Sequence, residues 1–236
     1  MDKRVLIIIP AYNEEECIKG VVDELTEICP EYDYVVVNDC STDRTVEILR
    51  DNKLNYINLP VNLGIGGNVQ TGYRYAVERG YDIAVQMDGD GQHMPEYLPI
   101  IVEKVASGEC DMCIGSRFIE KRGFQTSFMR RFGINFLKGL LHIACGVRVT
   151  DVTSGFRACD HDLFTYFAEN YAQDYPEPEA IMSAVMAGYT VGEAPVIMRE
   201  RATGTSSISA FKSVYFMIKV SIAIILARFT VKRRKR

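Results

Sequence analysis

The sequence predicts an α/β fold in which helices flank a mostly parallel central sheet. Short apolar, β-branched runs alternate with longer helical patterns through residues 1–118, and several of these runs end in Asn, Asp or Gly. Continuous apolar runs are typical of strands buried on both faces of a parallel sheet, and helices connect such strands. Ligands bind beyond the carboxyl ends of these strands. The residues that follow each run are therefore the first candidates for a functional site.

Each element of this alternation is assigned from its own residues. The predicted strands are Val5–Ile9, Tyr34–Val37, Tyr56–Leu59, Asp82–Met87 and Asp111–Gly115. The predicted helices run from Asn13 to about Cys29, over Thr45–Asn52, from the glycine-rich loop Asn62–Gly67 to about Arg79, and over Pro95–Ser107. Asn13 is expected to cap the first helix, because an Asn side chain accepts hydrogen bonds from first-turn N–H groups.

The second half of the chain is less regular. Ile134, Leu137, Leu141 and Cys145 share one helical face, which predicts an amphipathic helix over Phe128–Cys145. The remaining predicted elements are a turn-rich loop over Asp151–Ala158, a helix over Glu179–Ala187, a strand over Val191–Met198 and a polar loop over Ala202–Ser209.

Composition and charge narrow the functional classes. The 236 residues carry a formal net charge of −4, so nucleic acid is not expected as a partner. Seven cysteines without framework spacing, together with an N-terminal apolar run too short for a signal peptide, predict a cytosolic setting with free thiols. Cys110 and Cys113 form an isolated pair without a second Cys or His pair at ligand spacing, which argues against a zinc site.

An acidic motif follows the fourth predicted strand. Asp88 and Asp90 flank a glycine there, and Asp39 follows the second strand. Two short carboxylates at this spacing can converge on one hard cation, and Mg²⁺ or Mn²⁺ also accepts oxygens from a phosphate. Gln92 could add an amide oxygen or orient a water on the metal. A solvated turn is the alternative interpretation of such a motif taken alone.

The glycine-rich segment Gly64–Gly67 does not match the nucleotide-binding motifs that it superficially suggests. A dinucleotide-binding GxGxxG follows the first strand, whereas this segment follows the third and has Val69 where a glycine would be needed. A GxxxxGK[ST] phosphate loop is also absent from the sequence. The segment is therefore predicted to be a tight strand-to-helix turn.

Taken together, the motifs resemble those of family 2 glycosyltransferases of the GT-A fold. The segments that carry the resemblance, in the family's order, are Ile9–Glu14, Val37–Asp43, Asn62–Gly64 and Asp88–His93. Three later segments, Gly115–Arg117, Asp151–Arg157 and Arg201–Ser206, are similar to the dolichyl-phosphate (polyprenyl-phosphate) sugar synthase branch. The resemblance covers about residues 4–208. It implies a Rossmann-like GT-A domain over residues 1–208 and a C-terminal amphipathic interface helix with a basic tail over residues 209–236.

The resemblance also implies roles for the matching residues. The expected donor-binding residues are Pro10, Ala11, Tyr12, Glu14, Asp39, Gly64, Asp88, Gly89, Arg201 and Ser206. Asp88, Asp90 and Gln92 would hold Mg²⁺ or Mn²⁺. Arg117 and Arg131 would hold phosphate, from acceptor or donor, and with Asp88 and Asp90 they complete the expected catalytic set; a planar guanidinium suits phosphate oxygens.

The implied activity is the inverting, metal-dependent transfer of a sugar from a UDP- or GDP-sugar to a polyprenyl phosphate. A clear acidic pair that could serve as a base is missing from the later region, where Glu177 and Glu179 are the nearby candidates and capping of a helix is their alternative role. A phosphate acceptor needs no base, because its second pKa is about 6. Transfer to a growing cell-surface glycan and a sugar-nucleotide nucleotidyltransferase are the alternatives. The acidic Pro10–Glu14 segment argues against the second of these.

Two segments suggest contact with a membrane surface. Ala210–Val231 is nominally long enough to span a bilayer, but Lys219 in its middle would be costly there. Interfacial helices over this segment and Phe128–Cys145 are therefore expected, assisted by the basic residues Lys232–Arg236. The alternative is that Phe128–Cys145 packs in the core. The expected location is the cytoplasmic face of the cell membrane, with a separate small membrane protein and a homo-oligomer as candidate assemblies.

Overall fold

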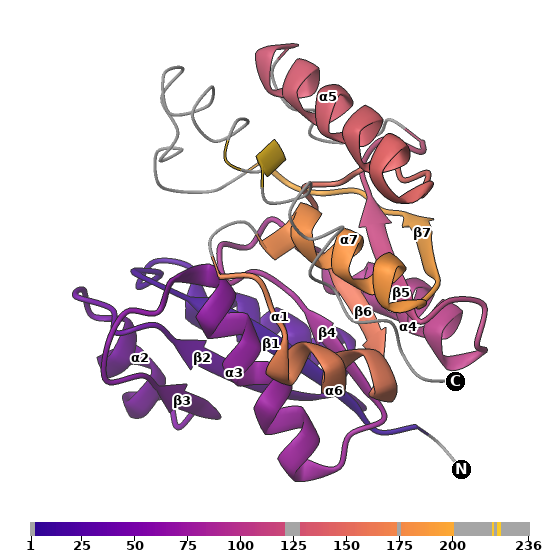
Figure 1. Ribbon diagram of the computed structural model, residues 1–236. Coiled ribbons are helices and arrows are strands. Elements are labelled where there is room, and N and C mark those ends of the chain that lie inside the picture. The colour runs from indigo at the N-terminus through magenta and orange to yellow at the C-terminus, as the bar shows by residue number, and fades with distance from the viewer. Residues whose placement is uncertain (1–2, 121–127, 174–175, 201–218, 220, 223–236) are drawn as a thin grey trace.

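The computed structural model describes residues 3–120, 128–173, 176–200, 219 and 221–222. Its centre is a seven-stranded sheet (Figure 1). The strands are β1 (Val5–Ala11), β2 (Asp33–Asn38), β3 (Tyr56–Asn58), β4 (Ile83–Gln86), β5 (Met112–Ser116), β6 (Arg157–Asp160) and β7 (Val191–Pro195). Their order is β3-β2-β1-β4-β6-β5-β7, and only β6 runs antiparallel to its neighbours. The predicted α/β class with a mostly parallel sheet is confirmed.

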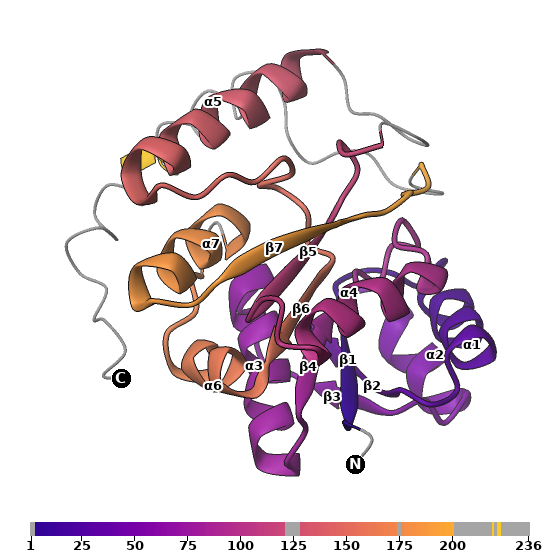
Figure 2. The ribbon, with the colours of Figure 1, turned by 90° about the vertical axis from the view of Figure 1, so that its right-hand side faces the viewer.

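Helices cover both faces of this sheet (Figures 1 and 2). They are α1 (Ile18–Ile28), α2 (Thr45–Asp51), α3 (Gly64–Arg79), α4 (Leu98–Ala106), α5 (Phe128–Cys145), α6 (His161–Glu169) and α7 (Pro176–Ala187), with a short 3-10 turn over Pro95–Tyr97. One buried cluster joins the sheet to α1, α2 and α4, and the other joins it to α3, α5, α6 and α7. Residues of β1 alternate between the two clusters, as a central strand requires.

The first helix begins later than predicted. Asn13 does not cap it, because Asn13 has a left-handed φ of 56° and α1 starts at Ile18. Instead the Asn13 side-chain oxygen accepts the backbone N–H of Thr42 at 2.8 Å. The loop after β1 is therefore fastened to the loop after β2, which shapes the edge where both strands end.

The glycine-rich segment is helical rather than a loop. Helix α3 begins at Gly64, so Gly64–Gly67 form its first turn. A Cβ on Gly66 would lie 2.2 Å from the carbonyl oxygen of Ala172. The start of α3 can therefore approach the 172–173 backbone only because this residue has no side chain.

The second half holds two elements that the sequence patterns did not predict. Strand β6 emerges from the predicted turn-rich loop and inserts between β4 and β5, and α6 follows it directly. Helix α7 starts at Pro176, earlier than predicted, and β7 ends at Pro195, short of the predicted Met198.

Helix α5 spans the predicted residues and packs against α7, at the outer side of the molecule (Figure 2). Three residues of its predicted apolar face, Ile134, Leu137 and Leu141, are buried in the core, so the core-packing alternative holds for that face. Within the described part of the chain, each helix is too short or too polar to cross a bilayer. The proposed interface helix over residues 209–236 lies almost wholly outside the described residues.

Candidate active site

The end of β1, the loops that follow β1, β2 and β4, and the start of α3 line one pocket of about 350 Å³. Its lining residues are Pro10, Ala11, Tyr12, Glu14, Asp39, Asn62, Gly64, Ile65, Asn68, Asp88, Gly89 and Asp90. The pocket thus brings together the predicted donor-binding residues that lie in the described ranges. Gln92, Arg117 and Arg131 are not part of the lining. Arg201 and Ser206 fall outside the described residues, so their roles stay predictions.

Asp39 forms the wall of this pocket at the end of β2. Its side chain is buried, and its backbone N–H donates to the Ala11 carbonyl at 2.9 Å. Its Oδ1 accepts the backbone N–H of Leu63 at 2.7 Å, and the Asn62 amide donates to its carbonyl at 3.1 Å. The segment before α3 therefore fixes this carboxylate in one orientation.

The β1–α1 loop forms a second wall and is held by hydroxyl groups. The backbone N–H of Asn13 donates to Ser41 Oγ, and that of Glu14 donates to Thr45 Oγ1, both at 2.9 Å. The Gly89 N–H reaches the Pro10 carbonyl at 3.3 Å. These bonds place the predicted nucleoside side of the pocket next to the acidic motif.

Asp88 and Asp90 line the pocket at the end of β4. Asp88 Oδ1 accepts from Gln86 Nε2 and Asp90 Oδ1 from the Gln92 N–H, each at 3.0 Å. The donor set consists of oxygen atoms, which fits Mg²⁺ or Mn²⁺. The described residues contain no group of three or more His, Cys, Asp or Glu side chains placed to hold a metal ion, so such a cation would complete its shell with water and phosphate oxygens.

Gln92, the third predicted metal ligand, has its side chain elsewhere. Its Nε2 donates to the carbonyl of Arg199 at 3.3 Å. The backbone N–H of Arg199 in turn donates to the Gln92 carbonyl at 2.9 Å. In this structure Gln92 joins the acidic loop to the segment after β7, and its role as a metal ligand stays a prediction.

His93 helps to position Asp88 by accepting a hydrogen bond from its backbone, a role that the sequence patterns did not reveal. The Asp88 N–H donates to His93 Nδ1 at 3.0 Å, and His93 Nε2 lies 3.8 Å from Asp88 Oδ2. Because Nδ1 accepts, the neutral ring carries its proton on Nε2, facing the carboxylate. The ring is 5% exposed and stacks on Phe156 with centroids 4.8 Å apart. The only signal for this role was the position of His93 within the Asp88–His93 motif.

The turn before β6 closes the other side of Asp88. A Cβ on Gly155 would lie 2.9 Å from Asp88 Oδ2 and 2.8 Å from Gln86 Nε2, so the backbone of this turn rests directly against the carboxylate. Arg157, which is fully buried, donates to the carbonyls of Ser154 and Glu177, both at 2.7 Å. It thereby ties this turn to the first turn of α7.

Arg117 is engaged within the protein. Its Nε and Nη2 contact Asp151 Oδ2 and Oδ1 at 2.7 and 2.8 Å, and Nη2 also reaches Thr153 Oγ1 at 3.1 Å. Asp151 is fully buried, so this is an internal ion pair rather than a surface one. Contact between Arg117 and a phosphate stays a prediction.

Arg131 lies near Arg117 beside a second pocket. Both guanidinium carbons lie over the Phe118 ring, 5.3 Å (Arg117) and 5.4 Å (Arg131) from its centroid. The second pocket, of about 220 Å³, is lined by Phe118, Arg131, Ile134, Asn135, Lys138 and Thr150. Lys138 is the cation at this site that the sequence patterns did not single out.

Comparison with known proteins decides the family. The model of the family described as Glycosyl transferase family 2 matches residues 6–167. The chain belongs to this family. It is 32% identical over 216 residues to an undecaprenyl-phosphate mannosyltransferase of Micrococcus luteus, covering 87% of this chain and 88% of that protein. It is 31% identical over 253 residues to a UDP-N-acetylglucosamine–dolichyl-phosphate N-acetylglucosaminyltransferase of Methanococcus voltae, covering 95% and 99%.

Solved structures support the fold. Glucosyl-3-phosphoglycerate synthase from Mycobacterium tuberculosis, in complex with phosphoglyceric acid, superposes with a TM-score of 0.74 at 18% identity, covering 98% of this chain and 81% of that one. The same enzyme with Mn²⁺, UDP and glucosyl-3-phosphoglycerate gives a TM-score of 0.72 at 19% identity. The GT-A fold and the glycosyltransferase class are confirmed, and the nucleotidyltransferase alternative is set aside.

Proposed function

We propose that this glycosyltransferase moves a sugar from a UDP- or GDP-sugar to a polyprenyl phosphate, with inversion and with the help of Mg²⁺ or Mn²⁺. The observation that carries the proposal is the shared pocket, in which Asp88 and Asp90 lie beside the ends of β1 and β2. Its volume of about 350 Å³ is within the range of small-molecule sites. The two relatives named above act on undecaprenyl phosphate and dolichyl phosphate according to their names.

The reaction needs an activated leaving group more than it needs a base. An oxygen of the acceptor phosphate would attack the anomeric carbon while the bond from that carbon to the donor diphosphate breaks and the nucleoside diphosphate leaves. A divalent cation stabilises charge on a leaving diphosphate by roughly several kcal/mol. Asp88 and Asp90 would hold this cation, while His93 and the Gly155 turn fix the position of Asp88.

The acceptor supplies its own negative charge. Glu177 and Glu179 lie in the first turn of α7 and are not part of the pocket lining. A phosphate monoester has a second pKa of about 6, so it is ionised near neutral pH without a base. The arrangement therefore favours a phosphate over a sugar hydroxyl as the nucleophile.

The second pocket supports a place for the acceptor phosphate. Arg131 and Lys138 bring two cationic side chains to its lining, and Thr150 adds a hydroxyl group. Guanidinium and ammonium groups bind phosphate oxygens through charge-assisted hydrogen bonds.

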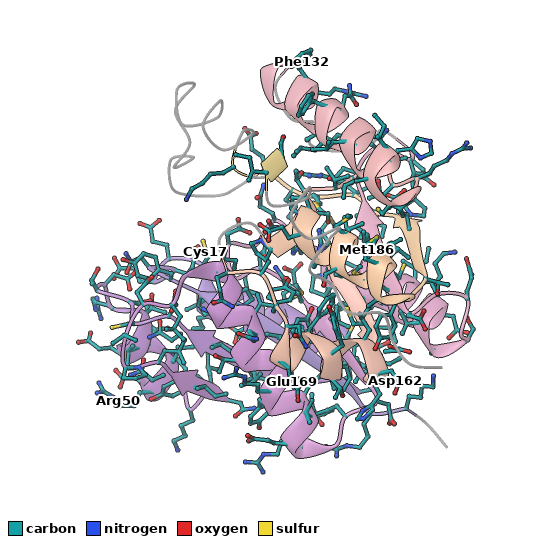
Figure 3. The ribbon with its side chains drawn as sticks, viewed as in Figure 1. Cys17, Arg50, Phe132, Asp162, Glu169 and Met186 are labelled. Atoms are coloured by element: carbon teal, nitrogen blue, oxygen red, sulfur yellow. The ribbon has the colours of Figure 1, made fainter. Side chains whose placement is uncertain are left out.

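The outer face of α5 supports contact with a membrane. Phe132, Phe136 and Ile143 are 63%, 47% and 80% exposed, on the side opposite the buried Ile134 and Leu141. Phe132 lies at the end of α5 that is far from the sheet (Figure 3). Exposed apolar side chains on a helix suit the headgroup region of a bilayer. Location at the cytoplasmic face, a small membrane protein partner and a homo-oligomer stay predictions.

A donor panel tests the proposal. The protein is incubated with undecaprenyl phosphate, Mn²⁺ and either GDP-mannose, UDP-glucose or UDP-N-acetylglucosamine, and products are resolved by mass. We expect one donor to give a lipid-phosphate sugar, and Asp90→Ala to lower the rate by about 10²-fold or more through loss of the cation. Asp51→Ala, on the exposed surface of α2, is the matched control. Equal rates in both variants, or transfer to a glycan alone, would contradict the proposal.

A further inference from the structure

A buried acceptor atom in the pocket lacks a partner. Asn68, near the start of α3, lines the pocket and is 2% exposed. Its Nδ2 donates to the carbonyl of Val37 at 2.9 Å. Among the described residues, none pairs with its buried Oδ1. Buried polar side-chain atoms are seldom left unpaired, so this oxygen calls for a donor beyond the described residues, and a ligand bound in the pocket can provide one.

The orientation of the Asn68 amide is fixed by its neighbour. The oxygen and nitrogen of an Asn side chain can be interchanged when hydrogen atoms are not observed. Here the Val37 carbonyl can only accept, so the nitrogen must face it. The unpaired atom is therefore the oxygen, and whatever meets it must carry a hydrogen-bond donor.

The position of Asn68 within the pocket indicates which part of a ligand it meets. Strands β2, β1 and β4 are consecutive neighbours, with Asn68 bonded to β2 and the acidic pair following β4. Two strand spacings separate these ends by roughly 10 Å. If the acidic pair holds the diphosphate, as the proposed function requires, the β2 end receives the far part of the nucleoside, which is the base.

Bases differ in the donor that they offer to such an oxygen. Uracil has a ring N3–H and guanine a ring N1–H, whereas the corresponding ring nitrogens of cytosine and adenine are acceptors. Asp39, the carboxylate at the same end of the pocket, is also an acceptor when ionised. We propose that Asn68 Oδ1 accepts the ring N–H shared by uracil and guanine and so selects UDP- and GDP-sugars against ADP- and CDP-sugars.

Binding of nucleoside diphosphates tests this inference without any transfer. Calorimetric titrations in Mn²⁺ compare UDP, GDP, ADP and CDP, together with N3-methyl-UDP and N1-methyl-GDP, in which the ring N–H is replaced. We expect the methylated form of the preferred nucleotide to bind about tenfold more weakly than its parent, because a buried acceptor stays unpaired. In Asn68→Ala the parent should weaken by a similar factor, and the gap between parent and methylated forms should close. Asn52→Ala, at the exposed end of α2, should keep the gap.

Two outcomes would overturn the inference. One is a gap that persists in Asn68→Ala, and the other is a wild-type protein that binds the methylated form as tightly as its parent. If Asn68→Ala does not fold, a crystal structure of the wild-type complex decides, because a water or a ribose hydroxyl at Oδ1 in place of the ring N–H is incompatible with the assignment. Base selection without sugar transfer would reject only the proposed function. Transfer without base selection would reject only this inference.

Discussion

Charged side chains at the two ends of the sheet have different surroundings. At the β1, β2 and β4 end, the carboxylates of Asp39, Asp88 and Asp90 line one pocket. At the β5 and β7 end, the charge of Arg117 is matched internally by the buried Asp151. At the first end, therefore, carboxylates line a pocket, whereas at the second end the ion pair of Arg117 holds the protein's own loops in place.

Glu193 shows how complete the internal pairing at the second end is. Its carboxylate accepts the Thr150 N–H at 2.8 Å, the Thr150 hydroxyl at 2.9 Å and the Asp151 N–H at 3.0 Å. This fixes the backbone that carries Asp151, and Asp151 in turn fixes Arg117. Among the described residues, Arg131 and Lys138 of the second pocket are the cations that we propose to meet an acceptor phosphate.

The largest expected effect comes from breaking the internal ion pair. Asp151→Ala removes the carboxylate that pairs with the buried guanidinium of Arg117, which should lower the free energy of unfolding by about 3–5 kcal/mol. The double variant Arg117→Met/Asp151→Leu replaces both charges with apolar side chains of similar size and should restore most of this loss. Urea denaturation followed by circular dichroism measures both.

The double variant also tests the predicted phosphate contact of Arg117. If stability and sugar transfer both return, the pair is structural and the contrast between the two ends holds. If stability returns without transfer, Arg117 also contacts substrate. A loss of less than about 1 kcal/mol in Asp151→Ala, the size of an exposed pair, would contradict the buried-pair interpretation itself.

The first five strands could be predicted because each lies in its own apolar run of the sequence. Strand β6 could not, because it has four residues and is bounded by Arg157 and Asp160. Its place between β4 and β5 depends on pairing with strands that are distant in the chain. The predicted cap at Asn13 was wrong for a related reason, since its side-chain oxygen accepts the backbone N–H of Thr42 in the separate β2–α2 loop.

The residues of the candidate site also differ in whether the sequence alone could reveal them. Asp39, Asp88 and Asp90 were found because the ends of parallel strands converge whatever the details of packing. The roles of Asn68 and Gly155 follow from contacts with Val37 and Asp88, in other parts of the chain. Local pattern therefore located the acids, and only the folded chain showed what holds them.

Gly155→Ala should disturb the β1, β2 and β4 end of the sheet while leaving the fold intact. The added Cβ would lie 2.9 Å from Asp88 Oδ2, so the carboxylate must move. Since a shift of about 1 Å in a catalytic group can cost roughly 10²-fold, we expect a fall of that order in kcat. Weaker Mn²⁺ binding, measured by electron paramagnetic resonance, should accompany it. Gly20→Ala on α1, where a Cβ meets no atom within 4 Å, is the control. Unchanged kcat in Gly155→Ala would show that Asp88 tolerates displacement.

The smallest effect is expected at His93. Two substitutions there separate the hydrogen bond to the Asp88 backbone from the stacking on Phe156. His93→Phe keeps a ring to stack on Phe156 but leaves the part-buried N–H of Asp88 without an acceptor. His93→Asn loses the stack but places an oxygen near the position of Nδ1. An N–H without an acceptor costs about 1–3 kcal/mol, so the Asp88 backbone should shift toward another partner. Because a displaced catalytic carboxylate lowers the rate, we expect the Phe variant to lose about tenfold or more in kcat and the Asn variant less. KM for the donor should change little in either, because His93 is not part of the pocket lining. The reverse order would mean that stacking on Phe156, rather than the bond to the Asp88 backbone, positions this carboxylate.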